Sequence, residues 1–184
     1  MSFSEKVKLW FSKVFGNSNT VPPINNENSL PPRPRNRAEI VAIFGANVEG
    51  GSDKWESENL KFCEIPDSFT AFPLKNGKRG FICHKKVIPA FQLVFNEIAA
   101  SGLSSLIYSF DGCYNPRKIT GGTALSFHAY GIAIDINYEG NTYGDSTPSM
   151  DKRIVAIFKK YNFDWGGDYS GNKDGMHFEY FKRS

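Results

Sequence analysis

One ten-residue stretch, Ser126–Asp135, constrains the fold more than any other part of this sequence. It places His128, one of only three histidines in 184 residues, seven positions before Asp135. In a continuous strand, residues an odd number apart point to opposite faces, so these two side chains could not share a ligand. A turn or bulge near residues 129–131 would bring them together, and glycine at position 131 permits such a turn.

The residues after this turn are predicted to form a strand over 132–137, whose alternation separates a core face from a cleft face. The core face consists of Ile132, Ile134 and Ile136. The cleft face consists of Ala133, Asp135 and Asn137. Neutral histidine nitrogen and carboxylate oxygen are ligands suited to Zn²⁺, which makes His128 and Asp135 candidate metal ligands.

A third candidate ligand, His177, lies near the C-terminus in a segment of clean alternation. Apolar residues occupy positions 176, 178 and 180, while His177 and Glu179 share the opposite face. Asp174 lies three residues before His177. A His/Asp/His set leaves a fourth tetrahedral position for water, which is the arrangement of a catalytic zinc site.

These residues resemble the signature of the M15 zinc peptidases, SxHxxGxAxD followed by a C-terminal DxxH. The family includes D-alanyl-D-alanine carboxypeptidases and L-alanyl-D-glutamate endopeptidases, many of them phage endolysins. The segment 163–168, FDWGGD, also resembles the family's WGG segment, and the resemblance covers roughly residues 38–184. The matching positions are Ser126, His128, Gly131, Ala133, Asp135, Asp174 and His177.

The resemblance implies an α+β fold: a small antiparallel sheet with flanking helices on a zinc scaffold shared with the hedgehog signalling domain. It also implies Zn²⁺ on His128, Asp135 and His177, with Asp174 as general base and proton donor to the leaving amine. Glu179 is a competing candidate for the base, because it shares a face with His177. Ser126 is expected to hydrogen-bond within the site and not to act as a nucleophile.

Arg117, in the loop before the metal motif, stands where the resemblance supplies a substrate-binding arginine. A guanidinium suits a peptide carboxylate or a developing oxyanion. Without the resemblance, a solvated loop arginine would be the better interpretation.

The chain divides into three predicted parts. Residues 1–16 have apolar positions at helical spacing among three lysines, which indicates an amphipathic helix that docks on a surface or partner, or else packs on its own domain. Residues 17–36 are rich in proline and asparagine and predict an extended spacer, although PPRPR could also bind a proline-reading domain. Residues 37–184 form the peptidase-like domain.

Within that domain the sequence predicts helices over 38–44 and about 86–101, and a third that begins at Thr147-Pro148 and runs to about 161. Strands are predicted over 60–65, 80–84 and 103–110, with a turn at 111–112. The last of these helices has one apolar face, formed by Ile154, Ile157, Phe158 and Tyr161, and is predicted to be scaffold.

The remaining features restrict the function. The net charge of +3 favours an anionic partner such as a cell wall but is too small to predict nucleic-acid binding. Three scattered cysteines lack CxxC spacing and are expected to be reduced thiols. His84 follows Cys83 without a third ligand partner, so an ordinary core or surface histidine is favoured over metal binding.

The candidate ligands predict a zinc site, and the resemblance implies a zinc peptidase that cleaves peptidoglycan stem peptides. The alternative is a non-catalytic, zinc-stabilised cell-wall or protein binding module. The sequence predicts no signal peptide and no transmembrane segment, whereas the substrate would lie outside a bacterial membrane. We therefore expect a phage particle or another delivery route to the cell wall or periplasm, with residues 1–16 bound to a particle protein. Endopeptidase and carboxypeptidase activity remain open alternatives.

Overall fold

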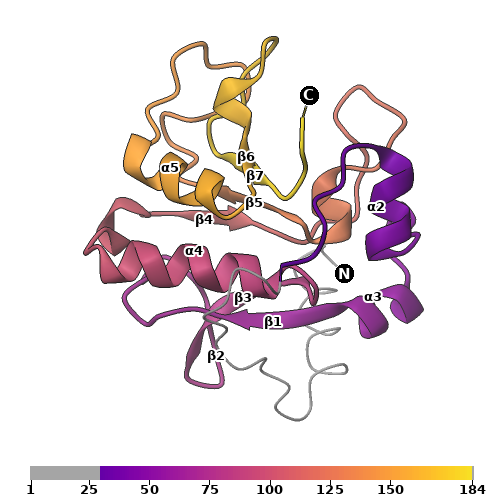
Figure 1. Cartoon of the computed structure of the whole chain (residues 1–184), viewed down its shortest axis with the longest axis horizontal. Coiled ribbons are helices and arrows are strands. Elements are labelled where there is room, and N and C mark those ends of the chain that lie inside the picture. Colours follow the sequence, from indigo (N-terminus) through magenta and orange to yellow (C-terminus); the bar gives the residue numbers. More distant parts are fainter. Residues whose placement is uncertain (1–29, 184) are drawn as a thin grey trace, which may run out of the picture.

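A computed structural model describes residues 30–183 of the chain, and they form an α+β fold (Figure 1). The predicted N-terminal helix over 1–16 and most of the predicted spacer lie outside the described residues. The described part contains four α-helices and two small antiparallel sheets. The helices are α2 (Arg37–Phe44), α3 (Asp53–Asn59), α4 (Ile88–Ala100) and α5 (Lys152–Lys160). No helix among these residues is long and apolar enough to cross a bilayer.

The first sheet has the strand order β1-β3-β2, and the second has the order β4-β5-β7-β6. The first contains β1 (Leu60–Glu64), β2 (Leu74–Lys75) and β3 (Lys78–His84). The second contains β4 (Phe110–Gly112), β5 (Ala133–Ile136), β6 (Asp164–Trp165) and β7 (His177–Glu179). Three short 3-10 helices occupy the connections: η2 (Ser104–Leu106), η3 (Phe127–Tyr130) and η4 (Gly166–Asp168).

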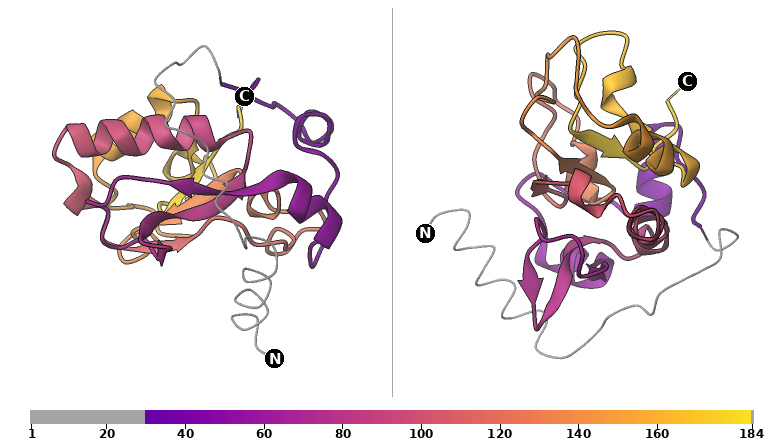
Figure 2. Two further views of the ribbon diagram at one scale, coloured as in Figure 1. Left: turned by 90° about the horizontal axis from the view of Figure 1, so that it is seen from below. Right: turned by 90° about the vertical axis from the view of Figure 1, so that its left-hand side faces the viewer.

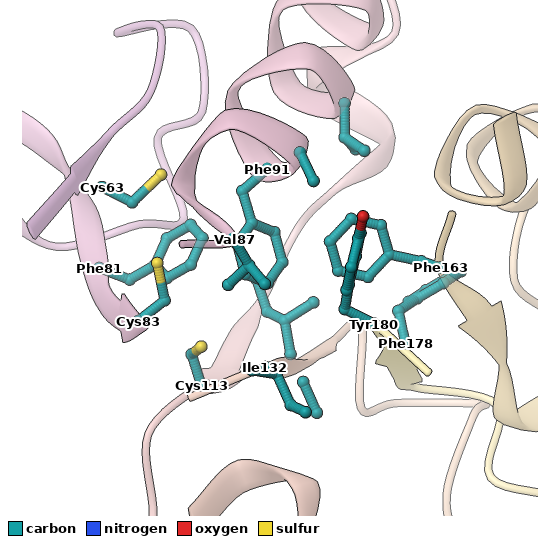
Figure 3. Packing of buried hydrophobic residues seen from close by; sticks show 14 of the residues in the cluster. Cys63, Phe81, Cys83, Val87, Phe91, Cys113, Ile132, Phe163, Phe178 and Tyr180 are labelled. Carbon is teal, nitrogen blue, oxygen red and sulfur yellow. The ribbon is translucent and has the colours of Figure 1, made fainter. Parts of the chain in front are cut away.

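Helix α4 lies at the centre of the core, between the two sheets (Figures 1 and 3). Most of its residues are buried, as expected for a helix that is apolar on nearly all sides. Phe91 contacts Phe81 of the first sheet, with ring centroids 5.0 Å apart, and Phe163 on the other side at 4.7 Å. The two sheets are therefore joined through one continuous core of aromatic and aliphatic side chains.

The predicted helix over 38–44 is confirmed as α2. Its N-cap, Asn36, accepts a hydrogen bond from the Glu39 amide at 2.9 Å, and the Glu39 side chain accepts one in return from the Asn36 side chain. This reciprocal capping fixes the first turn. The predicted helix over about 86–101 is likewise confirmed as α4.

The predicted start of the last helix at Thr147 is wrong. Thr147 donates its amide to the Asp145 carboxylate at 2.9 Å, which forms a local turn. Helix α5 begins at Lys152 instead, and its N-cap is Asp151, whose carboxylate accepts the Arg153 amide at 2.8 Å. Thr147 and Asp151 are both residue types that cap helices. Thr147 belongs to the turn at Asp145, and Asp151 is the residue that caps α5.

The predicted strand over 103–110 is also wrong, since residues 104–106 form η2 and only Phe110–Gly112 joins the sheet. The same region corrects the predicted orientation of Asn137, which does not face a cleft. Asn137 has a positive φ of 56°, is buried, and donates to the Leu106 carbonyl at 2.7 Å while accepting the Tyr108 amide at 2.8 Å. It therefore holds the irregular 106–108 segment against the end of β5.

The end of the predicted spacer contacts the folded domain. Residues 30–36 run beside the C-terminal residues 180–183 (indigo and yellow in Figures 1 and 2). The Tyr180 hydroxyl donates to the Pro31 carbonyl at 2.8 Å, and the Lys182 amide donates to the Pro34 carbonyl at 2.8 Å. The folded part thus includes seven residues that were predicted as spacer, whereas the division of residues 1–29 stays a prediction.

Candidate metal centre

The turn that the odd spacing of His128 and Asp135 requires is the 3-10 helix η3. Ser126 caps this helix, and its hydroxyl accepts the His128 amide at 3.2 Å, as predicted for a hydrogen-bonding serine. Gly131 ends it in the left-handed conformation, with φ 62°. A Cβ at position 131 would also lie 2.8 Å from the backbone nitrogen of His84, so both conformation and space call for glycine there.

His177 reaches the same place through the sheet. Strand β7 pairs with β5 in antiparallel register, and His177 lies directly opposite Asp135. Directly opposed residues on neighbouring strands project from the same face, so these two side chains meet. The turn at η3 adds His128 from a third direction.

The three predicted ligands converge on one point. The His177 Nδ1 atom lies 2.8 Å from Asp135 Oδ1 and 3.1 Å from His128 Nε2. The distance from His128 Nε2 to Asp135 Oδ1 is 3.2 Å. Ligands about 2.0–2.2 Å from one tetrahedral zinc ion would lie roughly 3.3–3.6 Å from each other. The observed triangle is only slightly tighter, so these residues fit a metal ion of this kind.

The second nitrogen of each histidine is occupied by an oxygen of the protein. His128 Nδ1 donates to the Cys113 carbonyl at 2.7 Å, and His177 Nε2 donates to the Glu179 carboxylate at 3.1 Å. Each of these bonds fixes the ring and leaves the other nitrogen facing the point of convergence. This arrangement is typical of metal-binding histidines.

The electrostatics of the three residues favour a cation. Burial by itself would raise the pKa of Asp135, but the charges and hydrogen bonds of His128 and His177 lower that pKa well below its usual range. Burial opposes the charged form of His177 too, yet hydrogen bonds to Asp135 and Glu179 raise its pKa to about 10. One buried and one half-buried carboxylate around a single imidazole create a strongly negative environment.

Asp174 lies beside this centre with an unused acceptor. Burial is the main cause that raises the pKa of Asp174, and His177, Asp135, His128 and Arg117 are the charges that act on it. Among the described residues, its buried Oδ1 atom has no hydrogen-bond partner. An unpaired buried carboxylate oxygen is costly in a purely structural role.

The WGG segment explains how Asp174 is held. The Asp174 amide donates to the Gly166 carbonyl at 3.0 Å, and a Cβ at position 166 would lie 2.9 Å from the Asp174 Cβ. Trp165 donates its indole NH to the Gly175 carbonyl at 2.7 Å. Glycine at 166 therefore allows the backbone of η4 to approach Asp174, on which the charges of the three candidate ligands act.

Arg117 lies on the loop antiparallel to the start of η3, where its carbonyl accepts the Ser126 amide at 2.9 Å. Its side chain is exposed, and its only hydrogen bond among the described residues is to the Lys118 carbonyl at 3.2 Å. The position is close enough for its charge to act on Asp174. The proposed role in substrate binding stays a prediction.

The structure shows why His84 is not part of this centre. His84 accepts the Lys86 amide at Nδ1 (3.1 Å) and donates from Nε2 to the Phe44 carbonyl (3.1 Å), so both nitrogens are used. The three cysteines are buried and free, as expected from their spacing. The aromatic residues Phe127, Tyr130 and Trp165 are buried.

Two parts of the centre were not recognised from the sequence. The Cys113 carbonyl is a backbone group, so no residue type signals its role. Arg183 pairs with Glu179 four residues earlier, in a segment that is not helical, so helical spacing gives no signal either. Glu179 itself could have been recognised, since carboxylates commonly orient metal-binding histidines.

A comparison with protein families bears on this geometry. The family model described as D-alanyl-D-alanine carboxypeptidase, Peptidase_M15_4, matches residues 120–180. The match supports an M15 family peptidase. It spans η3, β5, the WGG segment and β7, and so includes His128, Asp135, Asp174 and His177. The α+β fold is consistent with this family. No solved structure matches the chain.

Proposed function

We propose that the chain is a zinc metallopeptidase that hydrolyses the stem peptides of peptidoglycan. The observation that carries the proposal is the convergence of His128, Asp135 and His177 beside the unpaired carboxylate oxygen of Asp174. The family match supports the peptidase class, and the ligand geometry supports zinc. The proposed substrate class rests on the resemblance of the sequence to cell-wall peptidases.

In this proposal each residue has a distinct task. His128, Asp135 and His177 hold the metal. A zinc ion bound there would supply an acidified water, with a pKa lowered from about 15.7 towards about 7, and would polarise the scissile carbonyl. Asp174 accepts the water proton at its free Oδ1 atom and later returns that proton to the leaving amine. Burial, which raises the pKa of Asp174, also favours its proton-bearing form in the second step.

Glu179 is a poorer candidate for the base. Its carboxylate is fully buried and bonds to His177 Nε2, on the side of the ring away from the converging atoms, and to Arg183. Both oxygens are therefore engaged. Arg117, exposed and held only by a neighbouring carbonyl, is free to bind a substrate carboxylate or the developing oxyanion.

The alternative function is a zinc-stabilised binding module that lacks catalysis. Such a module needs the three ligands but no base. The unpaired Asp174 Oδ1 atom favours the peptidase, because a buried oxygen with no hydrogen-bond partner among the described residues is costly in a purely structural role.

We also propose that the chain reaches the cell wall as part of a phage particle or by a similar delivery route, with residues 1–16 as the docking segment. A chain that begins at Leu30 should then cleave soluble stem peptides at the full-length rate but no longer bind such a particle. Loss of turnover on soluble peptides after this truncation would contradict the separation of docking and chemistry.

The function is tested by digestion of purified peptidoglycan, with the products identified by mass spectrometry. The proposal predicts new amino and carboxyl ends within the stem peptide, and the identity of the ends distinguishes an endopeptidase from a carboxypeptidase. Zinc-loaded protein that releases no peptide product would instead favour the binding module.

A further inference from the structure

The side of His177 that faces away from the metal centre is held by a second layer of charge. The fully buried Glu179 carboxylate accepts His177 Nε2 and forms an ion pair with Arg183 through both of its oxygens. Arg183 in turn donates to the Tyr169 hydroxyl at 3.0 Å and lies over the Tyr169 ring, 4.0 Å from its centroid. A buried carboxylate depends on such a partner, so the place of Glu179 depends on that of Arg183.

Residues 180–182 connect the end of β7 to Arg183, and contacts with an N-terminal segment of the domain hold them in place. The segment Leu30–Asn36, here called the N-terminal clasp, bonds to each of the three intervening residues. Its Pro31 carbonyl accepts the Tyr180 hydroxyl, Arg33 Nε donates to the Phe181 carbonyl at 2.9 Å, and its Pro34 carbonyl accepts the Lys182 amide.

The clasp and Arg183 also meet at one carboxylate. Asp164 accepts the Arg183 amide at 2.8 Å with one oxygen and forms an ion pair with Arg33 through the other. Figures 1 and 2 show the clasp and the C-terminal segment side by side. Residues 180–183 belong to no strand. The Tyr180 amide donates to the Ile132 carbonyl at 2.8 Å, and beyond this point the contacts with the clasp and with Asp164 help to hold the segment that leads to Arg183.

We propose that the N-terminal clasp acts through Arg183 and Glu179 to position His177 for metal binding. Arg33, Glu179 and Arg183 are positioning residues in this account, and none touches the metal or the substrate. The inference rests on the proposed zinc site. The part of the chain that the sequence presents as a spacer thereby contributes to metal affinity.

Loss of a carboxylate that orients a metal-binding histidine typically lowers metal affinity about 10–100-fold. We expect an effect of this size for Glu179→Gln, since the charge that pairs with Arg183 is lost. Arg183→Ala should lower the zinc affinity about tenfold, because Arg183 acts on His177 through Glu179. Arg33→Ala should lower it only a few-fold, because Arg33 acts through the C-terminal segment and Arg183.

The test is a zinc titration of the full-length chain in competition with a chromophoric chelator. A matched control is Arg79→Ala, because Arg79 also donates to backbone carbonyls, those of Phe72 at 2.8 Å and Asp67 at 3.1 Å, but lies in the other sheet. Absorption spectra of the Co²⁺-loaded variants give a second readout that a general loss of stability would not shift. Arg183→Lys, which restores a positive charge, should recover part of the affinity.

The expected result is weaker zinc binding and altered Co²⁺ bands in the three positioning variants, with the parent affinity and spectrum in Arg79→Ala. Arg33 lies near the surface, so Arg33→Ala provides a folded variant even if Glu179→Gln does not fold. Parent-like zinc affinity in Arg33→Ala would overturn the role of the clasp, even if Arg183→Ala binds zinc more weakly, and parent-like affinity in Arg183→Ala would overturn the whole proposal. A parent that binds zinc in this titration but hydrolyses nothing would refute the proposed function and leave the positioning result standing.

Discussion

Each of the two sheets carries a buried histidine, and their surroundings are opposite. His84, at the end of β3, is enclosed by the aromatic rings of Phe44 and Trp55 and bonds only to backbone groups. Burial lowers its pKa to about 4. His177, at the start of β7, lies between the carboxylates of Asp135 and Glu179, which overcome burial and raise its pKa to about 10.

The comparison shows that burial does not decide the chemistry of a histidine. Both rings are removed from solvent, but the neighbours of His84 favour the neutral ring, whereas those of His177 favour a positive charge. A metal ion and a proton compete for the Nδ1 atom of His177. The surroundings of His177 therefore suit a cation, whereas those of His84 suit a neutral histidine in the core.

The largest expected effect is on metal content. Alanine in place of His128, Asp135 or His177 should remove most of the bound zinc, because each supplies one of three protein ligands. His84→Gln should retain about one zinc per chain, since neither nitrogen of His84 is available. Elemental analysis of the purified variants measures both. Full zinc occupancy in His177→Ala would break the distinction between the two histidines.

The next effect is on turnover without loss of metal. Asp174→Asn nearly preserves size but removes proton acceptance, so kcat for a stem peptide should fall by about 10²-fold or more while zinc is retained. Glu179→Gln should lower kcat less, by about tenfold, because it weakens the hydrogen bond that orients His177. If Glu179→Gln were inactive and Asp174→Asn near native, the base would be misassigned.

The neutral state of His84 predicts a loss of stability in acid. Its pKa is about 4 in the folded chain and about 6.5 when unfolded, so between these values the unfolded chain binds more protons. Stability is thus lost as the pH falls from about 6.5 to about 4, by about 3 kcal/mol in total. Urea unfolding of the chelator-treated parent and of His84→Gln measures this, because the metal-site groups contribute equally to both.

A parallel decline in stability for both proteins would show that His84 does not titrate in this way.

The smallest effect concerns Gly131, the residue that the two regions share. Its carbonyl accepts the His84 amide at 2.9 Å, and its left-handed turn carries His128 into the metal centre. Gly131→Ala should lower the free energy of unfolding by about 1–2 kcal/mol, because alanine is strained in the left-handed conformation. The contact of the new Cβ with the His84 backbone in β3 should add to this loss. Thermal unfolding and zinc titration should therefore change together, and a change in neither would mean that the turn tolerates a side chain.

The convergence of the three candidate ligands could be predicted because its signals are local. Gly131 indicates the turn, the spacing of His128 and Asp135 requires it, and the alternation around His177 identifies its strand. Short elements with competing signals could not be placed in this way. The strand expected over 103–110 is displaced because Asn137, far along the chain, binds its backbone.

The support behind the ligands could not be predicted, for a related reason. The contacts of Arg33 with Phe181 and Asp164 join residues more than 130 positions apart. The sequence around Arg33 is rich in proline and polar residues, as in a spacer, and nothing local distinguishes a spacer from a segment that packs in extended form. Only the folded structure shows that residues 30–36 contact residues 180–183.

The most direct test of the account is the hydrolysis of one defined stem peptide with zinc content measured in parallel. The account predicts turnover by the zinc-loaded chain, loss of turnover when a chelator removes the metal, and recovery when zinc is added back. It also predicts zinc-loaded but nearly inactive Asp174→Asn. Turnover that persists in metal-free protein, or a zinc-loaded parent that never cleaves the peptide, would contradict it.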